Sequence, residues 1–467
     1  MKPIVAASFV ALMLVTSIAF SAQVPEAEDD RPKVGDAALG SLSYDDFSPD
    51  DECAMCHAGI VRQFDQSLMS QCFTHEWDEI EYFELALPHA MKEEKVVGIK
   101  AGCNGCHSPI AFLAGDIPPS RPAEGTRANE AISCDLCHSI AGFEGDVPFN
   151  FNYVIRAGDA VQGARPGVES PGHEIDVNPF LATAELCGTC HNEKDPFGVW
   201  VKSTHLEWKE SAWARGGIVC QDCHMPPAEG NTAPEMGGQD HPDVRQHLFH
   251  GAHDPGKLMG AVEVRIHPSE LEVAPGETVT LTATVVNAKA GHMIPSGSVE
   301  ERVVWLHVEA IDAAGDRYHL VVDHKGFDGE EMTIASAEAL AYQDIGAIQG
   351  LEDFAGLKRD GDVPSGDRIF RMPYLDPQGR MTIAQWNTAS LGPDYRLAPL
   401  EARNETFTWK LPEGIATGDV TVEATVYYSR LVSSVGEYLG VPAEESRPEL
   451  MGRHNTRFDV VRTAAGG

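Results

Sequence analysis

Basic residues are scarce in this 467-residue sequence. Lysine and arginine number 35 against 71 aspartates and glutamates, so the formal net charge is −36 at pH 7. Nucleic-acid phosphates and anionic lipid headgroups are bound by clustered lysine and arginine. The charge balance therefore excludes nucleic acid as a partner and argues against adhesion to an anionic bilayer, although peripheral association with a membrane stays open. It favours basic protein partners, which an acidic surface attracts.

Long apolar runs are also rare. One run, residues 3–20, follows Met1-Lys2 and ends in small residues. A basic start, an apolar core and a small-residue end are typical of a secretory signal peptide. We therefore expect residues 1–21 to be removed and the protein to be periplasmic or extracellular, with a single uncleaved membrane anchor as the alternative. Residues 22–51 are acidic and rich in Pro, Gly and Ser, which predicts an irregular leader.

Cysteine is absent from the second half of the chain, since the last cysteine is Cys223. The 11 cysteines are an odd number, so disulfides alone cannot use every thiol. Ten of them fall in five copies of one C-x-x-C-H pattern. The five copies are Cys53-Ala-Met-Cys56-His57, Cys103-Asn-Gly-Cys106-His107, Cys134-Asp-Leu-Cys137-His138, Cys187-Gly-Thr-Cys190-His191 and Cys220-Gln-Asp-Cys223-His224.

This pattern is the attachment signature of c-type haem. The two thiols bond to the haem, and the adjacent imidazole becomes the proximal iron ligand. Zinc sites also use C-x-x-C pairs, but zinc does not require a histidine directly after every second cysteine. The sequence therefore predicts five covalently attached haem c groups, with His57, His107, His138, His191 and His224 as proximal ligands. Haem would supply much of the apolar core, which accounts for an aromatic content of only 7%.

Each iron also needs a second axial ligand, unless its sixth position stays open for chemistry. Further histidines precede residue 254, and we expect some of them to be bystanders. They are His75, His89, His173, His205, His241, His247, His250 and His253. The intervals between motifs alternate between long and short, and the short intervals place neighbouring haems close together, as electron transfer requires.

Segments around the motifs resemble the multihaem c-type cytochromes related to the cytochrome and the hydroxylamine oxidoreductase of nitrification. These segments are Gln63–Met69, Pro109–Pro119, Pro171–Glu174, Glu207–Ser211 with Cys220–Pro226, and Arg245–Gly251. The resemblance implies that His173 and His247 are distal ligands. The loop Gly291-His292-Met293-Ile294-Pro295-Ser296-Gly297 is similar to a family loop, which implies that His292 ligates a haem across a domain boundary. The alternative is that His292 only shapes a turn.

Met69 stands where the family often has a ligand histidine. Met69 is either a thioether ligand or a core residue on an apolar helical stripe. His75, His89 and His205 are further candidates for the second ligand. The leftover Cys72 is expected to be a buried free thiol, with an iron ligand, an extra thioether or an intermolecular disulfide as alternatives.

The C-terminal part has a different pattern of apolar residues. Alternating apolar residues predict strands at 278–285, 303–311, 407–411 and 420–428. The expected fold class is therefore multidomain: a mostly α or irregular pentahaem cytochrome c domain (52–258), followed by an all-β immunoglobulin-like sandwich (259–467). The stretch 323–391 fits the sandwich poorly and is expected to be a long insertion.

The favoured function is an exported electron carrier that connects redox protein partners through closely spaced haems. One alternative is a multihaem reductase or oxidase of small nitrogen or sulfur compounds, which needs one open haem. The wider resemblance places C-x-x-C-K at such a catalytic haem, and this chain has no such motif. Another alternative is a subunit of an extracellular cytochrome filament, joined through Cys72 or through a histidine without a partner in its own chain. The sequence gives no oligomeric state.

Overall fold

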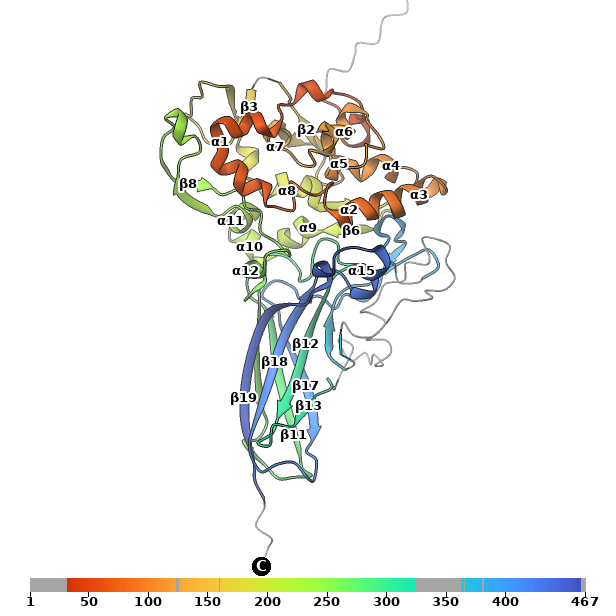
Figure 1. Ribbon diagram of the computed structural model, residues 1–467, viewed down its shortest axis with the longest axis vertical. Helices are drawn as coiled ribbons and strands as arrows, with labels where there is room; N and C mark the ends of the chain where they lie inside the picture. Colours follow the sequence, from red (N-terminus) through yellow and green to blue (C-terminus); the bar gives the residue numbers. More distant parts are fainter. Residues whose placement is uncertain are drawn as a thin grey trace, which may run out of the picture. The chain divides into compact units, whose positions relative to one another are not determined.

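The computed structural model describes residues 32–122, 126–158, 160–323, 363–364, 366–379 and 382–462 (Figure 1). The expected signal peptide, the first part of the leader and residues 324–362 of the expected insertion lie outside the described residues. Lys33–Gly467 form one compact unit. Among the residues described, no helix combines the length and apolarity that a membrane span requires.

Residues 32–258, here called the motif region, contain the five C-x-x-C-H motifs on short helices. The helices are α1 (Asp50–Asp65), α2 (Glu76–Ile80), α3 (Leu87–Ala90), α4 (Ile99–Gly102), α5 (Asn104–His107), α6 (Pro109–Ala114), α7 (Cys134–Ser139), α8 (Ala184–His191), α9 (Thr204–Lys209), α10 (Ala212–Arg215), α11 (Cys220–His224) and α12 (Pro255–Leu258). Shorter turns connect them: η1 (Gly35–Ala38), η2 (Tyr44–Asp46), the π-helical η3 (Glu81–Ala86), η4 (Glu94–Val96), η5 (Arg127–Asn129), η6 (Pro179–Ala182) and η7 (Pro234–Met236).

Local sequence explains where the motif helices start. Helix α1 begins with Asp50, Asp51 and Glu52, whose charges complement the positive N-terminal end of the helix dipole. Helix α7 is capped by Ser133, whose hydroxyl accepts a hydrogen bond from the backbone N–H of Leu136. In both helices the start lies within three residues of the motif's first cysteine. The helix start therefore places the first cysteine of each motif in the first turn.

Small two-stranded sheets lie between these helices. They pair β1 (Ile140–Phe143) with β2 (Tyr153–Ile155), β3 (Ala160–Gly163) with β4 (Glu174–Val177), β5 (Asn192–Lys194) with β6 (Trp200–Ser203), and β7 (Pro227–Gly230) with β8 (His241–Arg245). The β3–β4 pair is parallel and the other three are antiparallel. Strands β3, β4 and β8 supply backbone carbonyls that accept hydrogen bonds from histidine rings described below.

Residues 259–462, here called the sheet region, form two larger sheets. A six-stranded sheet has the order β10 (Glu272–Val273), β19 (Glu449–Val460), β18 (Gly418–Ser429), β12 (Val303–Ile311) and β13 (Arg317–His319), and β14 (Arg368–Phe370) also pairs with β12. A three-stranded sheet has the order β17 (Ala402–Lys410), β11 (Thr278–Asn287) and β9 (Val262–Pro268). Smaller elements complete the region: β15 (Tyr374–Leu375), β16 (Ser390–Leu391), α15 (Ser433–Leu439), η8 (Gln385–Asn387) and η9 (Ala443–Ser446).

The core of the sheet region follows the period-two pattern of the sequence. In β11 the side chains of Val279, Leu281, Ala283 and Val285 are fully buried, and the threonines between them face outward. They pack in one apolar cluster with buried residues of β9, β12, β17, β18 and β19. The two larger sheets therefore share one core.

The expected fold class is wrong. The motif region is not mostly helical or irregular, because four strand pairs alternate with its helices, and the sheet region is not all-β, because it contains α15. A C-x-x-C-H motif needs only about one helical turn to present its three side chains. The chain between motifs must still pair its backbone N–H and C=O groups, and short strand pairs achieve this locally. The result is a mixed fold.

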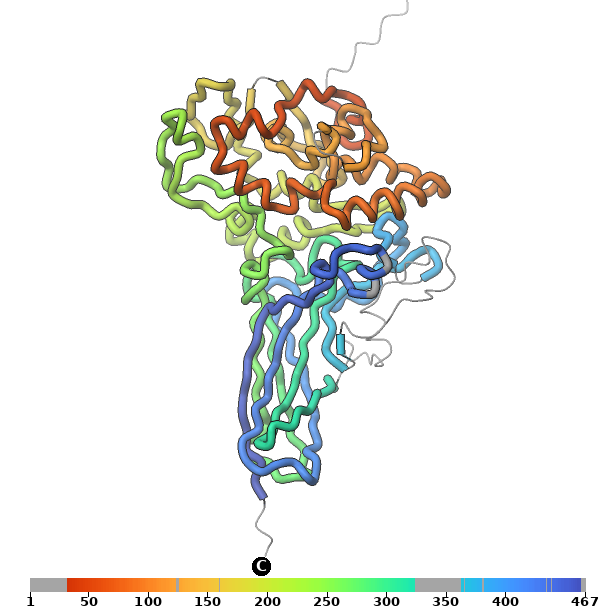
Figure 2. The backbone as a smooth tube through the Cα atoms, in the orientation of Figure 1, coloured from red at the N-terminus to blue at the C-terminus, as the bar shows by residue number. Residues whose placement is uncertain are grey.

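The motif and sheet regions share a second apolar cluster. Trp77 and Leu85 of the motif region pack in it with Trp305, Leu431 and Val432 of the sheet region. The tube in Figure 2 shows the segment around α15, in blue, beside the N-terminal helices in orange. The sheet region is therefore continuous in its packing with the part that carries the motifs.

Gly452 of β19 lies where the two larger sheets approach each other. A Cβ atom there would collide with the backbone carbonyl oxygen of Val262 in β9. We expect Gly452→Ala to lower the free energy of unfolding by about 1–3 kcal/mol, because backbone must move to make room. The matched control is Gly414→Ala, where no atom lies within 4 Å of the added Cβ and stability should change by less than about 1 kcal/mol. Thermal denaturation of both variants measures the difference, and equal midpoints would contradict the close approach.

Candidate functional site

All five C-x-x-C-H motifs open into one cavity of about 3430 Å³. Ordinary small-molecule pockets occupy about 300–1,000 Å³, so this cavity has room for several cofactors of porphyrin size. Both cysteines and the histidine of every motif line it. The residues therefore fit a set of haem groups that share one interior space.

Thiols from different motifs lie close enough together to shift one another's pKa values. The pairs are Cys53 with Cys134, Cys106 with Cys190, and Cys187 with Cys220. Each pair joins two different motifs, and together they connect the first motif to the third, the second to the fourth, and the fourth to the fifth. Cofactors bonded to these thiols would be close neighbours.

The ring nitrogen Nδ1 of each of four motif histidines is held by a backbone carbonyl. His57 Nδ1 donates to Thr232 at 2.9 Å, and the Nδ1 atoms of His107, His138 and His224 donate to Cys72, Gln162 and His250 at 2.7 Å. A carbonyl oxygen can only accept, so Nδ1 carries the proton and the lone pair is at Nε2. An imidazole prepared in this way binds metal through Nε2.

Three further histidines are held in the same way. His173 Nδ1 donates to the carbonyl of Glu174 at 3.0 Å, His247 to Arg245 at 3.0 Å, and His292 to Met293 at 2.8 Å. These are the three distal ligands that the family resemblance implies. All three present Nε2 as the free acceptor.

These three rings face three motif histidines. The ring centroids of His57 and His173 are 6.4 Å apart, those of His138 and His247 are 6.4 Å apart, and those of His224 and His292 are 6.5 Å apart. Two imidazoles bound to opposite sides of one metal ion at about 2.0–2.1 Å have ring centroids about 6–6.5 Å apart. The three gaps therefore match the space that one haem iron needs between two axial imidazoles.

Burial keeps the deeply placed rings neutral. Removal from water lowers the pKa of His138, and it lowers the pKa values of His191, His224 and His247 to about 4. Neighbouring histidines add to the effect in each case, since a second positive charge close by is unfavourable. A histidine must be neutral to bind a metal ion, so the cavity holds these four rings in the ligating form.

The other histidine candidates are held differently. His205 is buried, and its Nδ1 accepts a hydrogen bond from the amide of Asn192 at 3.2 Å. His89 does not line the cavity, and its Nδ1 accepts a hydrogen bond from the indole N–H of Trp386 at 3.0 Å. When Nδ1 accepts, the proton is on Nε2. Nδ1 is therefore the acceptor in both rings in this arrangement, in contrast to the seven rings above. The Nε2 atom of His205, which lines the cavity, is buried without a hydrogen-bond partner among the described residues, so the ligand roles of both histidines stay predictions.

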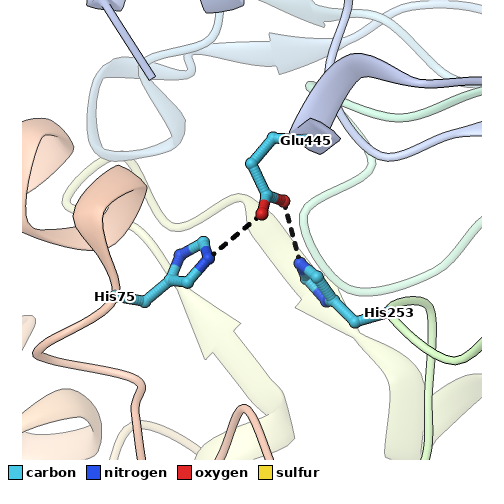
Figure 3. A group of neighbouring side chains, drawn as sticks. All are labelled: His75, His253 and Glu445. Atoms are coloured by element: carbon cyan, nitrogen blue, oxygen red, sulfur yellow. Dashed lines mark hydrogen bonds and ion pairs between the residues drawn. The ribbon is translucent and has the colours of Figure 1, made fainter. Parts of the chain in front are cut away.

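His75 belongs to a separate polar cluster, shown in Figure 3. Its Nε2 lies 3.3 Å from Glu445, and its Nδ1 lies 3.4 Å from Asp78. The other oxygen of Glu445 binds His253 Nε2 at 3.0 Å. Burial alone lowers the pKa of His75, but hydrogen bonds to Asp78 and Glu445 outweigh it and raise the pKa to about 9. His75 is therefore paired with two carboxylates in this arrangement, and its role as an iron ligand stays a prediction.

Two motif histidines have no facing ring of this kind. Among the residues that the structure describes, no histidine pairs across the cavity with His107 or His191 at the distance found for the other three. Met69 lines the same cavity and packs in the apolar cluster that contains Cys72, Cys106 and Cys190. The thioether ligand predicted at Met69 thus stays a prediction for one of these two positions.

Cys72 has a role that the sequence did not indicate. Its carbonyl is the acceptor that orients His107, and its Sγ lies 3.5 Å from the His107 carbonyl. Burial raises the pKa of the Cys72 thiol, so it stays protonated and unreactive. The odd cysteine thus supports the second motif from inside the cavity wall.

Glu207 has a role that the sequence did not indicate, beyond its place in a segment that resembles the family. Its carboxylate accepts hydrogen bonds from Met293 N–H at 3.1 Å and from the Ser296 hydroxyl at 2.6 Å, and it forms a buried ion pair with Arg396 at 2.6 Å. Met293 is the residue whose carbonyl orients His292. Glu207 therefore fixes the loop that brings a sheet-region histidine to the fifth motif.

The Glu445 cluster makes a prediction about pH. Burial raises the pKa of Glu445, but bonds to His253, His75 and Arg430 outweigh it and hold the pKa well below its usual 4.5. The depressed pKa of Glu445 stabilises the fold above about pH 4.5, and this stabilisation is lost as the pH falls. The raised pKa of His75 stabilises the fold below about pH 6.5, and this stabilisation is lost as the pH rises through 9. Glu445→Gln should therefore lower the free energy of unfolding by on the order of 2 kcal/mol between about pH 4.5 and 6.5, and by less above pH 9.

Chemical denaturation at several pH values checks this, with Glu444→Gln as the matched control because Glu444 is exposed and adjacent. A loss of stability that is independent of pH would contradict the charged His75–Glu445 pair.

Comparison with solved structures identifies one with the same fold, a penta-heme cytochrome c552 from Thermochromatium tepidum. It is 20% identical, the match covers 88% of this chain and 99% of that chain, and the TM-score is 0.56. The matched share runs through both the motif and the sheet regions, which agrees with their common packing. Spo0M, a sporulation control protein from Bacillus subtilis, matches 44% of this chain at 14% identity with a TM-score of 0.17, and it carries no argument. No protein-family model and no curated protein matches the chain.

Proposed function

We propose that the chain is a penta-haem c-type cytochrome that carries electrons between redox proteins. The observation that carries this proposal is the set of seven imidazoles whose Nδ1 atoms are held by backbone carbonyls, six of them facing each other in pairs 6.4–6.5 Å apart. Haem bound there would supply the one-electron chemistry. The chain supplies the thiols, the neutral Nε2 ligands and a shared interior.

The contacts between motifs support transfer from one haem to the next. Three pairs of thiols from different motifs are close enough to shift one another's pKa values, so macrocycles attached to them would be neighbours. Burial and ligand identity then set the potential of each haem. The proposed ligand sets differ, because three positions have facing histidines, whereas the described part of the chain places none opposite His107 or His191.

The proposed partners are redox proteins with basic docking surfaces. The formal charge of −36 gives the chain a strongly negative field, which accelerates encounters with positively charged proteins and weakens with added salt. The proposed location is the periplasm or the cell exterior, since haem c is attached outside the cytoplasm and the sequence starts with a signal-like segment. An intermolecular disulfide through Cys72 is not favoured, because its thiol lies inside the cavity and contacts the carbonyl of His107.

Each of the three facing histidines should be needed to keep one haem low-spin. We expect His173→Ala, His247→Ala and His292→Ala each to convert one low-spin haem to high-spin, with the number of attached haems unchanged because attachment depends on the cysteines. Paramagnetic resonance spectra and haem content measure both quantities, and added imidazole should restore the low-spin signal.

The controls are His267→Gln, on the exposed face of β9, and His89→Gln, whose Nδ1 accepts from Trp386. Both should leave the spin count unchanged. If His89→Gln removed a low-spin haem and His173→Ala did not, the tautomer argument would be wrong.

A second candidate function, reduction or oxidation of a small nitrogen or sulfur compound, is favoured by the two positions without a facing histidine. An open haem at His107 or His191 would give a high-spin signal in the wild-type holoprotein that shifts when nitrite, hydroxylamine or sulfite is added. Five low-spin haems that do not respond to these compounds would contradict this second function, and electron transfer would be the one proposal left.

A further inference from the structure

Three potential metal ligands meet on the six-stranded sheet, away from the motif cavity. His307 is in β12, His319 is in β13, and Asp367 directly precedes β14. Strands β13 and β14 both pair with the edge of β12 that does not pair with β18, with Glu309 opposite His319 and Leu306 opposite Arg368. Continuing that register by one residue brings Asp367 opposite His307. The sheet itself therefore aligns the three side chains on one face of β12 (Figure 1 labels β12 and β13).

The side chains converge on one carboxylate. The His307 Nδ1 atom lies 2.9 and 3.0 Å from the two oxygens of Asp367, and His319 Nε2 lies 2.7 Å from one of them. The two imidazoles are stacked, with their centroids 5.0 Å apart and an interplanar angle of 22°. The potential ligand atoms of the three residues all lie within 4.8 Å of one another.

Burial makes the Asp367 carboxylate costly to leave without a positive partner. The Asp367 side chain has 0% exposure, whereas the side chains of His307 and His319 are 25% and 32% exposed. A carboxylate removed from water requires a positive partner. The neighbouring Glu309 is paired with Arg317, so that arginine is already engaged. Two stacked imidazoles that both point at one buried carboxylate can share with it either a proton or a metal ion.

We propose that His307, His319 and Asp367 bind one divalent transition-metal ion of the zinc class. Imidazole nitrogen and carboxylate oxygen are ordinary zinc ligands at about 2.0–2.2 Å, and three protein ligands with a solvent-facing fourth position form an open site. Tetrahedral ligands are about 3.4 Å apart, so admitting the ion requires side-chain shifts on the order of 1 Å. The chain's net charge of −36 also concentrates cations near its surface.

The bound ion would connect β12 with the two strands, β13 and β14, that pair along one of its edges. This site is independent of the proposed haem function, because it uses none of the motif residues and lies outside the cavity that they line. A metal bound by the folded state alone raises the thermal midpoint. Zinc is therefore expected to stabilise the sheet region while the haem spectrum stays the same.

The experiment uses the purified holoprotein, stripped with a chelator and dialysed against Zn²⁺. Elemental analysis measures zinc, with iron as the internal standard for the amount of protein. The wild type and His267→Gln should each bind one zinc per chain and gain at least about 2 °C in thermal midpoint. Asp367→Asn and His319→Gln should each lower zinc affinity at least about tenfold, with an unchanged haem spectrum as proof that the protein is folded.

Two results would overturn the proposal. One is that the wild type binds no stoichiometric zinc at micromolar concentration. The other is that zinc bound to wild type, Asp367→Asn and His319→Gln is equal, which would indicate adventitious binding to the acidic surface. If the haem experiments above failed, amino-acid analysis would replace iron as the measure of protein and circular dichroism would replace the haem spectrum as the check of folding, so this test could still decide, since its readouts are zinc content and stability.

Discussion

The arrangement depends above all on one interaction, the hydrogen bond from a histidine Nδ1 to a backbone carbonyl. It occurs at four motif histidines and at three histidines from distant parts of the chain. Each such bond fixes the tautomer and turns Nε2 toward the cavity. Because the acceptors are backbone atoms, the orientation of the rings depends on how the segments fold around the cavity. Short strands supply three of the seven carbonyls, at Gln162, Glu174 and Arg245, and the connecting loops supply the other four.

The sheet region takes part in this arrangement through a buried polar contact. Glu207 holds the 293–296 loop and pairs with Arg396, and the carbonyl of Met293 orients His292 toward His224. Such a pair is costly to break, because either partner alone would be a buried charge. The shared apolar cluster around Trp77 and Trp305 adds to the same contact. The fifth proposed haem position is thus completed by a region that has no cysteine.

Several features could be predicted from the sequence because they depend on local spacing. The five motifs and the alternation in β11 are of this kind, whereas His173, His247 and His292 were implied by the family resemblance. The mixed fold was not predicted, because pairings such as β3 with β4 leave little periodicity in strands of four residues. His75, His89 and His205 were nominated as ligands from their position near the motifs. Their partners are Glu445, Trp386 and Asn192, and for His75 and His89 these lie far away in sequence, so tautomer and charge could not be inferred.

The most direct test of this account is the mass of the intact chain after denaturation of the purified protein. Covalent attachment survives denaturation, whereas a metal ion or a loosely bound cofactor is released. The account predicts the mass of the processed chain plus five haem groups, and the loss of one haem group when both cysteines of one motif are replaced by alanine. A chain mass without added haem, or with zinc released from the cysteines in its place, would contradict it.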